Sequence, residues 1–383
     1  MKEQYDISLL RAEIDECDRE LVNLLCKRME ICQRVALFKK EANMPIFDPA
    51  RERALLARIA ELSGEEYKDY MRVIYSSVLS ASKSHQSDII YPKGETAKLI
   101  EKTLEGTKKT FPKEAKVAVQ GVEGAYSQIA ASRLFQNPDI SFYGSFSDVF
   151  EAVNAGKAKY GVLPIENSAA GSVDKVYDLL REWGFYIVKA VSIKVDHCLL
   201  AKKGTKISDI TEICSHEQAI NQCSKFLSSF PGAKIYPSSN TARAAQFTRE
   251  TEDMGVAALS SRACAELYGL EILCESVQDT DNNHTRFICI SKEAEIYPDA
   301  DRTTVIFTAE DRPGALYSAL SEFYARGLNL AKLESRPIPG SDFDVLFYLD
   351  ISESVYSESL MAALSALEGR PGFRYLGSYG GNI

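Results

Sequence analysis

A hydroxyl, a guanidinium and a carboxamide stand together where the polar stretch 279–287 leads into the apolar run 288–290. They belong to Thr285, Arg286 and Asn283. None of these groups is needed to form a strand, so they are candidates for contacts with a substrate. A polar turn with side-chain capping would account for the same cluster without any activity. The local pattern leaves both interpretations open.

A second candidate group lies on one face of the first predicted helix. Residues 5–42 contain neither glycine nor proline, and their apolar residues recur in alternating steps of three and four. This heptad pattern predicts a long helix that pairs with another helix, most simply a second copy of itself. Arg28 interrupts the apolar seam, and Lys39 lies within about 20° of it around the helix. Two cations on one face indicate a pocket, whereas Arg28 alone would be explained by a side chain that reaches solvent.

Further polar groups follow on the next two predicted helices. Asp48 is the expected N-cap of a helix that opens with Arg51 and Glu52. Ser82 and Gln86 lie four residues apart, on one face of the third predicted helix.

These residues resemble the all-helical chorismate mutases over roughly residues 5–90. The rearrangement of chorismate needs no proton transfer and no nucleophile, so such an enzyme holds a compact conformer and stabilises charge on the ether oxygen. The resemblance implies carboxylate contacts from Arg28 and from Arg11 of a partner chain, since Arg11 lies about 100° away around the helix. It implies that Lys39 and Gln86 donate to the ether oxygen. The other implied contacts are Glu52 and the Asp48 region to the hydroxyl, with Arg51 and Ser82 completing the pocket.

The central part alternates predicted strands and helices, which is typical of an α/β fold. A glycine-rich turn at 121–127 leads into a helix and would present backbone N–H groups to an anion. Polar clusters at 166–168, 215–218 and 239–241 stand at expected strand ends, where open α/β sheets bind ligands. Each cluster alone is explained as a turn or an N-cap. Together with 279–287 they predict a polar pocket.

The motifs of this part resemble prephenate dehydratase over about residues 114–292, through Gly121–Ser127, Pro164–Ser168 with Gly171–Val173, and the Thr-Arg-Phe string at 285–287. That family has two α/β subdomains around a cleft, similar to periplasmic binding proteins. The resemblance implies that prephenate loses carbon dioxide and hydroxide to give phenylpyruvate. Thr285 is then the catalytic hydroxyl. The other implied substrate contacts are Ser127, Asn167, Gln218, Asn283, Arg286 as a counter-charge, and Glu166 either as a pocket acid or as a partner of another residue.

After Pro298 the predicted elements follow the order strand, helix, strand, strand, helix, strand, which fits a ferredoxin-like sandwich. Residues 312–316 and 334–337 resemble the two effector motifs of the ACT regulatory domain. The resemblance implies feedback inhibition by L-phenylalanine, with the helix N-terminus at Gly314 holding its carboxylate. The implied effector residues are Gly314, Ala315, Leu316, Asn329, Glu334, Ser335 and Arg336.

The bulk properties exclude several other classes. A net charge of −9 argues against a general nucleic-acid binder. No apolar run approaches the roughly 20 residues of a membrane span, and the N-terminus lacks a signal-peptide core, so we expect a cytoplasmic protein without membrane contact. Nine cysteines without a C-x-x-C pair and four histidines without ligand spacing predict free thiols and no metal. No organic cofactor is implied.

The predicted organisation is a multidomain chain in four parts: an all-α mutase domain at 1–90, a linker with one short helix at 91–113, an α/β dehydratase domain at 114–295, and an α+β ACT domain at 300–383. We therefore predict a bifunctional chorismate mutase–prephenate dehydratase of phenylalanine synthesis, as a homodimer or higher homo-oligomer. One alternative is a non-catalytic ligand sensor, and another is a mutase part that serves only as a dimerisation arm. Transition-state donors at Thr285, Lys39 and Gln86 favour catalysis, since a sensor has no need of them.

Overall fold

The computed structural model describes most of the chain, namely residues 6–90, 94–309, 314–338 and 345–381. Arg312 and Pro313 of the first effector motif lie outside the described residues. The chain forms two compact units, one made of residues 1–102 and 305–374 and the other of residues 103–304 and 375–383.

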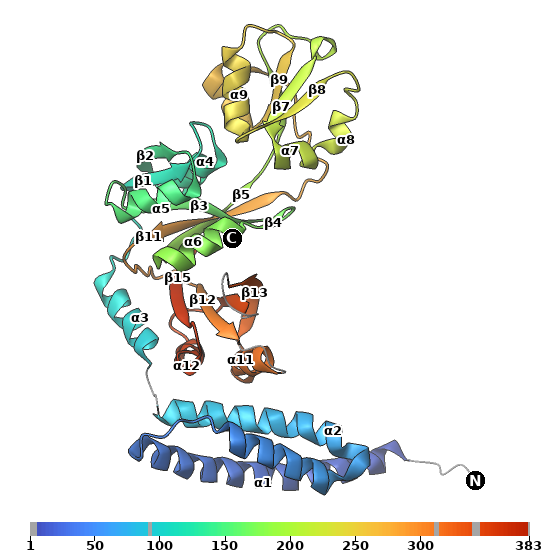
Figure 1. The fold of residues 1–383 in the computed structure, drawn as a ribbon, viewed down its shortest axis with the longest axis vertical. Coiled ribbons are helices and arrows are strands. Elements are labelled where there is room, and N and C mark those ends of the chain that lie inside the picture. Colours follow the sequence, from blue (N-terminus) through green and yellow to red (C-terminus); the bar gives the residue numbers. More distant parts are fainter. Residues whose placement is uncertain (1–5, 91–93, 310–313, 339–344, 382–383) are drawn as a thin grey trace, which may run out of the picture. The chain divides into compact units, whose positions relative to one another are not determined.

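Long helices precede the first strand (Figure 1): α1 Ile7–Glu41, α2 Pro49–Ile90 and α3 Glu95–Gly106. Asp48 accepts a hydrogen bond from the Arg51 amide at 3.0 Å, which confirms it as the N-cap of α2. Gly64 breaks α2 with a φ of 71°, a conformation that glycine adopts without strain. The break separates the second and third predicted helices, and α3 is the short helix expected in the linker.

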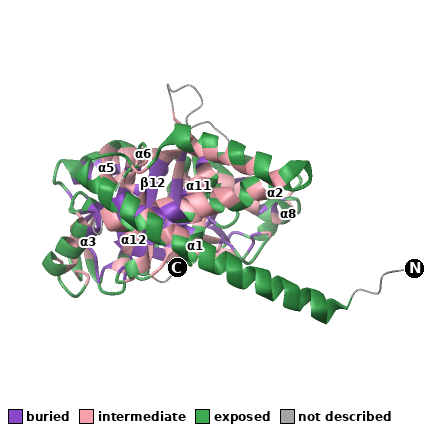
Figure 2. Cartoon of the chain, turned by 90° about the horizontal axis from the view of Figure 1, so that it is seen from below, coloured by how far each residue is buried: buried purple, intermediate pink, exposed green. Residues whose placement is uncertain are grey.

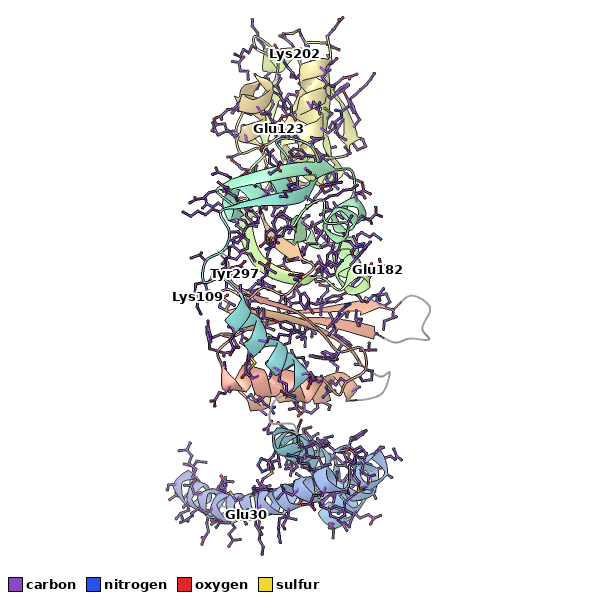
Figure 3. All side chains as sticks on the ribbon, turned by 90° about the vertical axis from the view of Figure 1, so that its left-hand side faces the viewer. Glu30, Lys109, Glu123, Glu182, Lys202 and Tyr297 are labelled. Carbon is purple, nitrogen blue, oxygen red and sulfur yellow. The ribbon has the colours of Figure 1, made fainter. Side chains whose placement is uncertain are left out.

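The apolar seam of α1 is exposed in the isolated chain. Figure 2 shows α1 as exposed along most of its length, and Ala36 is its buried residue. Leu24 is 66% and Phe38 is 63% exposed, although both belong to the predicted heptad seam. Polar side chains such as Glu30 also project from α1 (Figure 3). The helix therefore carries more apolar surface than its own chain covers.

The central part folds as two α/β lobes. In the first, which we call lobe A, the strand order is β2-β1-β3-β11-β5, with the short β4 beside β3. Buried residues of β1, β3 and β11 pack against α4 to form its core. Its elements are β1 Glu114–Gln120, α4 Tyr126–Leu134, β2 Asn137–Tyr143, α5 Phe146–Asn154, β3 Tyr160–Asn167, β4 Gly171–Ser172, α6 Asp174–Trp183, β5 Tyr186–Lys194 and β11 His284–Ser291.

The second lobe, lobe B, has the strand order β10-β6-β9-β7-β8. Figure 3 labels Glu182 in lobe A and Lys202 in lobe B. The elements of lobe B are β6 Cys198–Ala201, the 3-10 turn Ile207–Asp209, β7 Glu212–His216, α7 Glu217–Gln222, α8 Ser224–Leu227, β8 Lys234–Ser238, α9 Thr241–Glu250, β9 Val256–Ser260, α10 Arg262–Tyr268 and β10 Glu271–Cys274.

The chain crosses between the lobes at residues 195–197 and 275–283. The Val195 amide donates to the Asn283 carbonyl at 2.7 Å, and the Val277 amide donates to the His197 carbonyl at 2.9 Å. These bonds tie the two crossing segments to each other. The two paired segments thus form the connection between lobe A and lobe B.

The C-terminal elements appear in the predicted order, and their sheet has the strand order β13-β14-β12-β15. They are β12 Arg302–Ala309, α11 Ala315–Ala325, β13 Asn329–Pro337, β14 Val345–Ser352, α12 Glu358–Leu367 and β15 Arg374–Tyr379. The end of β15 and the residues after it run close to β5. A Cβ at Gly377 would collide with the Ile187 carbonyl, and a Cβ at Gly381 would collide with the Ala190 carbonyl. Only glycine permits so close an approach of the two backbones.

Candidate functional site

Thr285 and Asn167 lie opposite each other on the paired strands β11 and β3 of lobe A. Both side chains are buried, with exposed fractions of 9% and 7%. Asn167 Nδ2 donates to Thr285 Oγ1 at 2.9 Å. Thr285 was expected in a loop, but strand β11 begins at His284 because its backbone pairs with both β3 and β5. A strand holds the hydroxyl more rigidly than a loop would.

The hydrogen bonds of Asn167 leave the Thr285 proton available. Asn167 Oδ1 accepts from the amides of Ala169 and Ala170, each at 3.0 Å. Its nitrogen must therefore be the donor to Thr285 Oγ1. Since Thr285 accepts this bond, its own O–H is free to donate to a bound molecule.

A cavity of about 420 Å³ opens beside this pair, between lobes A and B. From lobe A it is lined by Ser127, Asn167 and Thr285, and from lobe B by Gln218, Gln222 and residues 239–241. Residues from each of the polar clusters predicted at strand ends therefore line one cavity, together with apolar residues such as Phe146 and Phe287. Among the described residues that line it there is no lysine, arginine, aspartate or glutamate.

Helix N-termini supply the positive potential that the lining side chains lack. Ala125, His216 and Asn240 are the N-cap residues of α4, α7 and α9, and all three line the cavity. His216 and Asn240 cap their helices with their side chains, whereas Ala125 makes no side-chain cap. The first amides of α4 thus remain available to an anion, as the glycine-rich turn predicted.

Three predicted substrate contacts do not line this cavity. Arg286 and Glu166 lie opposite each other on β11 and β3, one position beyond Thr285 and Asn167, so their side chains point to the other face of the sheet. Arg286 Nε is 3.0 Å from Glu166 Oε1, and Arg286 is 4% exposed. Of the two roles left open for Glu166, the structure favours that of a partner to another residue. Asn283 is 1% exposed and bonds to Asn167 rather than facing the cavity.

The face of strands β3 and β11 that carries Glu166 and Arg286 contacts the C-terminal segment. Arg286 Nη1 donates to Tyr379 Oη at 3.3 Å, and that hydroxyl lies 2.8 Å from Thr304 Oγ1. Tyr379 is 1% exposed. The arginine that was expected to neutralise a substrate carboxylate instead joins β11 to β15.

Sequence analysis missed Gln222 and His197, which both line the cavity. Gln222 lies four residues after Gln218, so helical spacing offered a signal for it. His197 follows β5 without any distinguishing pattern. Burial lowers the pKa of His197 and of His216 below the ordinary histidine value, which favours the neutral form of both imidazoles. Burial raises the pKa of the Tyr126 phenol well above its usual value.

The predicted mutase residues gather in part on α1 and α2. Arg28 Nη1 donates to Ser82 Oγ, which joins the two helices at a buried serine. Lys39 Nζ donates to the Ile46 carbonyl at 2.6 Å. Gln86 is 7% exposed, and its Oε1 has no partner among the described residues. The remaining positions are Glu52, whose carboxylate pairs with Lys83 at 2.9 Å, and Asp48, Arg51 and Arg11, which are exposed.

The predicted effector residues lie on α11 and β13. Gly314 is the N-cap of α11 with a φ of 81°, and Ala315 and Leu316 form its first turn. Asn329 begins β13, on which Glu334 and Arg336 are half-buried while Ser335 is exposed. Within the described ranges, no group of histidine, cysteine, aspartate and glutamate side chains has the arrangement of a metal site. No helix of the described part is long and apolar enough to span a membrane.

Comparison with known proteins gives two family matches, a chorismate mutase type II model over residues 10–87 and a prephenate dehydratase model over residues 117–295. The chain is 32% identical over 375 residues to the bifunctional chorismate mutase/prephenate dehydratase of Escherichia coli strain K12, covering 96% of this chain and 94% of that protein.

Two solved structures each resemble about 70% of the chain. A prephenate dehydratase from Arthrobacter aurescens in complex with L-Phe is 30% identical, with a TM-score of 0.63 over 69% of this chain and 89% of that one. A protein described as a quorum quenching acylase is 32% identical, with a TM-score of 0.64 over 70% of this chain and 98% of that one.

Proposed function

We propose that this chain, which belongs to the family of bifunctional chorismate mutase/prephenate dehydratases, uses the cavity between lobes A and B for dehydration and the helices α1 and α2 for the rearrangement. The chain is an enzyme with both activities. We assign it the conversion of chorismate to prephenate and of prephenate to phenylpyruvate in the cytoplasm.

The dehydratase step rests on one observation, the bond that Asn167 Nδ2 donates to Thr285 Oγ1, which leaves the proton of the threonine free to donate elsewhere. In the reaction the bond from the ring to its carboxylate breaks, its electrons enter the ring, and the hydroxyl at the opposite carbon leaves. Thr285 donates a hydrogen bond to that departing oxygen, where negative charge develops. Asn167 keeps the threonine in this orientation through its 2.9 Å bond.

Substrate carboxylates are held by helix dipoles and neutral hydrogen-bond donors rather than by cationic side chains. The uncapped N-terminus of α4, with Ser127 in its first turn, is the first of these sites. Gln218 in the first turn of α7 supplies a donor from the opposite lobe. Contacts from both lobes also exclude water from the reacting centre.

The mutase step uses the Arg28–Ser82 contact as its anchor. Arg28 binds a carboxylate of chorismate, and Lys39 and Gln86 donate to the ether oxygen, whose charge grows in the transition state. The bonds of Lys39 to the Ile46 carbonyl and of Glu52 to Lys83 hold these side chains near the site and are exchanged for substrate contacts. Arg51 and Asp48 complete the pocket near the start of α2.

A second copy of the chain covers the exposed seam of α1. Its apolar residues, such as Leu24 and Phe38, are more than half exposed, and a paired helix would bury them. An intertwined dimer also brings Arg11 of one chain to the Arg28 of the other. This arrangement makes the mutase pocket a shared one.

Mixing two inactive variants tests the shared pocket. Chains with Arg11→Ala and chains with Arg28→Ala should recover mutase activity when they form heterodimers, because one of the two pockets then holds both arginines. Chorismate consumption in purified heterodimers is the measurement. Mixing Arg28→Ala with Lys39→Ala is the control, since each pocket then lacks one group and activity should stay at the low level of the single variants. Equal behaviour of the two mixtures would contradict a pocket built from two chains.

We assign the C-terminal elements to an ACT domain with a ferredoxin-like sandwich. The strand order β13-β14-β12-β15 and the helices between the strands support this fold. The L-Phe complex of the similar dehydratase supports phenylalanine as the effector. Gly314 at the N-terminus of α11 offers backbone donors to its carboxylate, and Leu316 lies in the same turn to receive the ring. The contact from Tyr379 to Arg286 gives a route from β15 to the back of the strand pair that carries Thr285.

Calorimetric titration of phenylalanine tests the effector site. The wild-type chain should bind phenylalanine, and Leu316→Asp should abolish binding, because a carboxylate would replace the apolar contact with the ring. Leu267→Asp is the matched control, since Leu267 is 41% exposed and lies outside the proposed site. The coupling to the cavity should be about 1–3 kcal/mol, so a prephenate analogue should weaken phenylalanine binding correspondingly. Unchanged binding by Leu316→Asp would place the effector elsewhere.

A further inference from the structure

We propose that His197 is a positioning residue for the dehydratase reaction, which as a neutral imidazole with its proton on Nε2 orients Gln222 and, through it, Asn167 and Thr285. The inference rests on the proposed function of the cavity between the lobes. It follows from the directions of the hydrogen bonds around Asn167.

Two backbone amides set the direction of the whole network. The amides of Ala169 and Ala170 can only donate, so the Asn167 atom that accepts from them is its oxygen. Asn167 Nδ2 therefore donates to Thr285 Oγ1 at 2.9 Å and to Asn283 Oδ1 at 2.8 Å. The amide orientation of Asn283 is thereby also determined.

The bonds of Gln222 determine which imidazole nitrogen of His197 carries the proton. Asn283 Nδ2 donates to Gln222 Oε1 at 2.9 Å, and Gln222 Nε2 donates back to Asn167 Oδ1 at 3.4 Å. Gln222 Oε1 is thus an acceptor, and His197 Nε2 lies 3.3 Å from it. The imidazole must carry its proton on Nε2 to make this bond.

The position of the imidazole is determined by the crossing segments. His197 is 2% exposed, and its amide donates to Gln278 Oε1 at 3.0 Å. It sits where the chain passes from lobe A to lobe B, whereas Gln222 ends α7 of lobe B and Asn167 ends β3 of lobe A. His197 therefore holds a glutamine of one lobe against an asparagine of the other.

The surroundings of the ring favour its neutral form. Burial lowers the pKa of His197, and the neighbouring His216 lowers it further, while the bond to Gln222 and the charge of Asp196 act in the opposite direction. His197 Nδ1 has no partner among the described residues, so a second proton there would be buried without an acceptor. The Tyr126 ring packs edge-on against the imidazole at 6.3 Å between centroids.

Three substitutions separate a donor role from simple packing. His197→Gln places an amide nitrogen near the original Nε2 and should keep kcat for prephenate within about tenfold of wild type. In His197→Asn the amide nitrogen lies near the original Nδ1 and is too far from Gln222 to donate to it. His197→Leu has no donor. Both should lower kcat on the order of 10²-fold with a smaller change in KM, because the reacting groups are displaced more than the binding groups. Mutase activity of each variant, measured on chorismate, should remain at the wild-type level.

A double-mutant cycle then tests the path through Gln222. In a Gln222→Ala chain, adding His197→Leu should cost little more, because the histidine acts only through the missing side chain. Additive losses would overturn this path, and a loss in His197→Gln as large as in His197→Leu would overturn the donor role. Thr285→Val, assayed in parallel, distinguishes a failure of the cavity assignment from a failure of the histidine inference. If it retains activity the cavity assignment fails, whereas wild-type activity of His197→Leu beside an inactive Thr285→Val overturns the histidine inference alone.

Nitrogen NMR of the imidazoles gives a readout that does not depend on activity. The chain has four histidines, so the His197 signals can be assigned by their absence from the spectrum of His197→Gln. The wild type at neutral pH should show His197 as a neutral ring with its proton on Nε2. A charged ring, or a proton on Nδ1, would overturn the proposal.

Discussion

Replacement of Thr285 by valine should lower dehydratase turnover by about 10²–10³-fold, the typical cost of removing one donor to developing charge. Thr285→Ser should retain much more activity, because it keeps the hydroxyl that accepts from Asn167 and donates to the leaving oxygen. Valine is similar in shape to threonine, so a loss of turnover would reflect the missing hydroxyl and not a packing defect. The measurement is phenylpyruvate formation from supplied prephenate.

The structure also supplies controls for this comparison. Asn167 Nδ2 keeps its bonds to Asn283 Oδ1 and to the His284 carbonyl when the threonine oxygen is removed, so the strand pair should stay intact. Thr205→Val, at a threonine of 6% exposure that does not line the cavity, should leave dehydratase activity unchanged. Mutase activity should be normal in all these variants. Equal activity of the valine and serine variants would show that the hydroxyl has no catalytic role.

Replacement of Lys39 by alanine should lower mutase turnover by about a hundredfold, or roughly 3 kcal/mol of transition-state stabilisation. Its ammonium group is held at the Ile46 carbonyl in the unliganded chain and would donate to the ether oxygen when chorismate binds. Because the rearrangement uses no proton transfer, a lost electrostatic donor should lower kcat more than it raises KM. Chorismate consumption, followed by absorbance, measures the effect.

Lys40→Ala is the matched control, because Lys40 is the next residue of α1, is exposed, and donates to the Ile89 carbonyl at 3.3 Å. It removes the same charge from the same helix and should leave mutase activity near wild type. Dehydratase activity on supplied prephenate should survive in both variants. Near-normal mutase activity of the Lys39→Ala chain would remove Lys39 from the site.

Local patterns in the sequence predicted the larger elements well. The heptad seam of α1, the N-cap at Asp48 and the order of the C-terminal elements all appear in the structure, because each depends on residues close together in the chain. The edge strand β2 Asn137–Tyr143 was not predicted. Its residues are partly exposed, so its apolar pattern is weak, and pairing with β1 defines it.

The sequence by itself determined which chemical groups are present and which clusters belong to one pocket, since strand ends of an α/β fold converge. The resemblance to prephenate dehydratase then implied Thr285, Asn167, Ser127 and Gln218 as members of this pocket. Only the tertiary structure decided the direction in which neighbouring side chains point. The register of β11 on β3 places Thr285 and Asn167 on one face and Arg286 and Glu166 on the other, because successive residues of a strand alternate between faces. The partners of Asn167 likewise come from a crossing segment and a separate lobe, and no local pattern records such contacts.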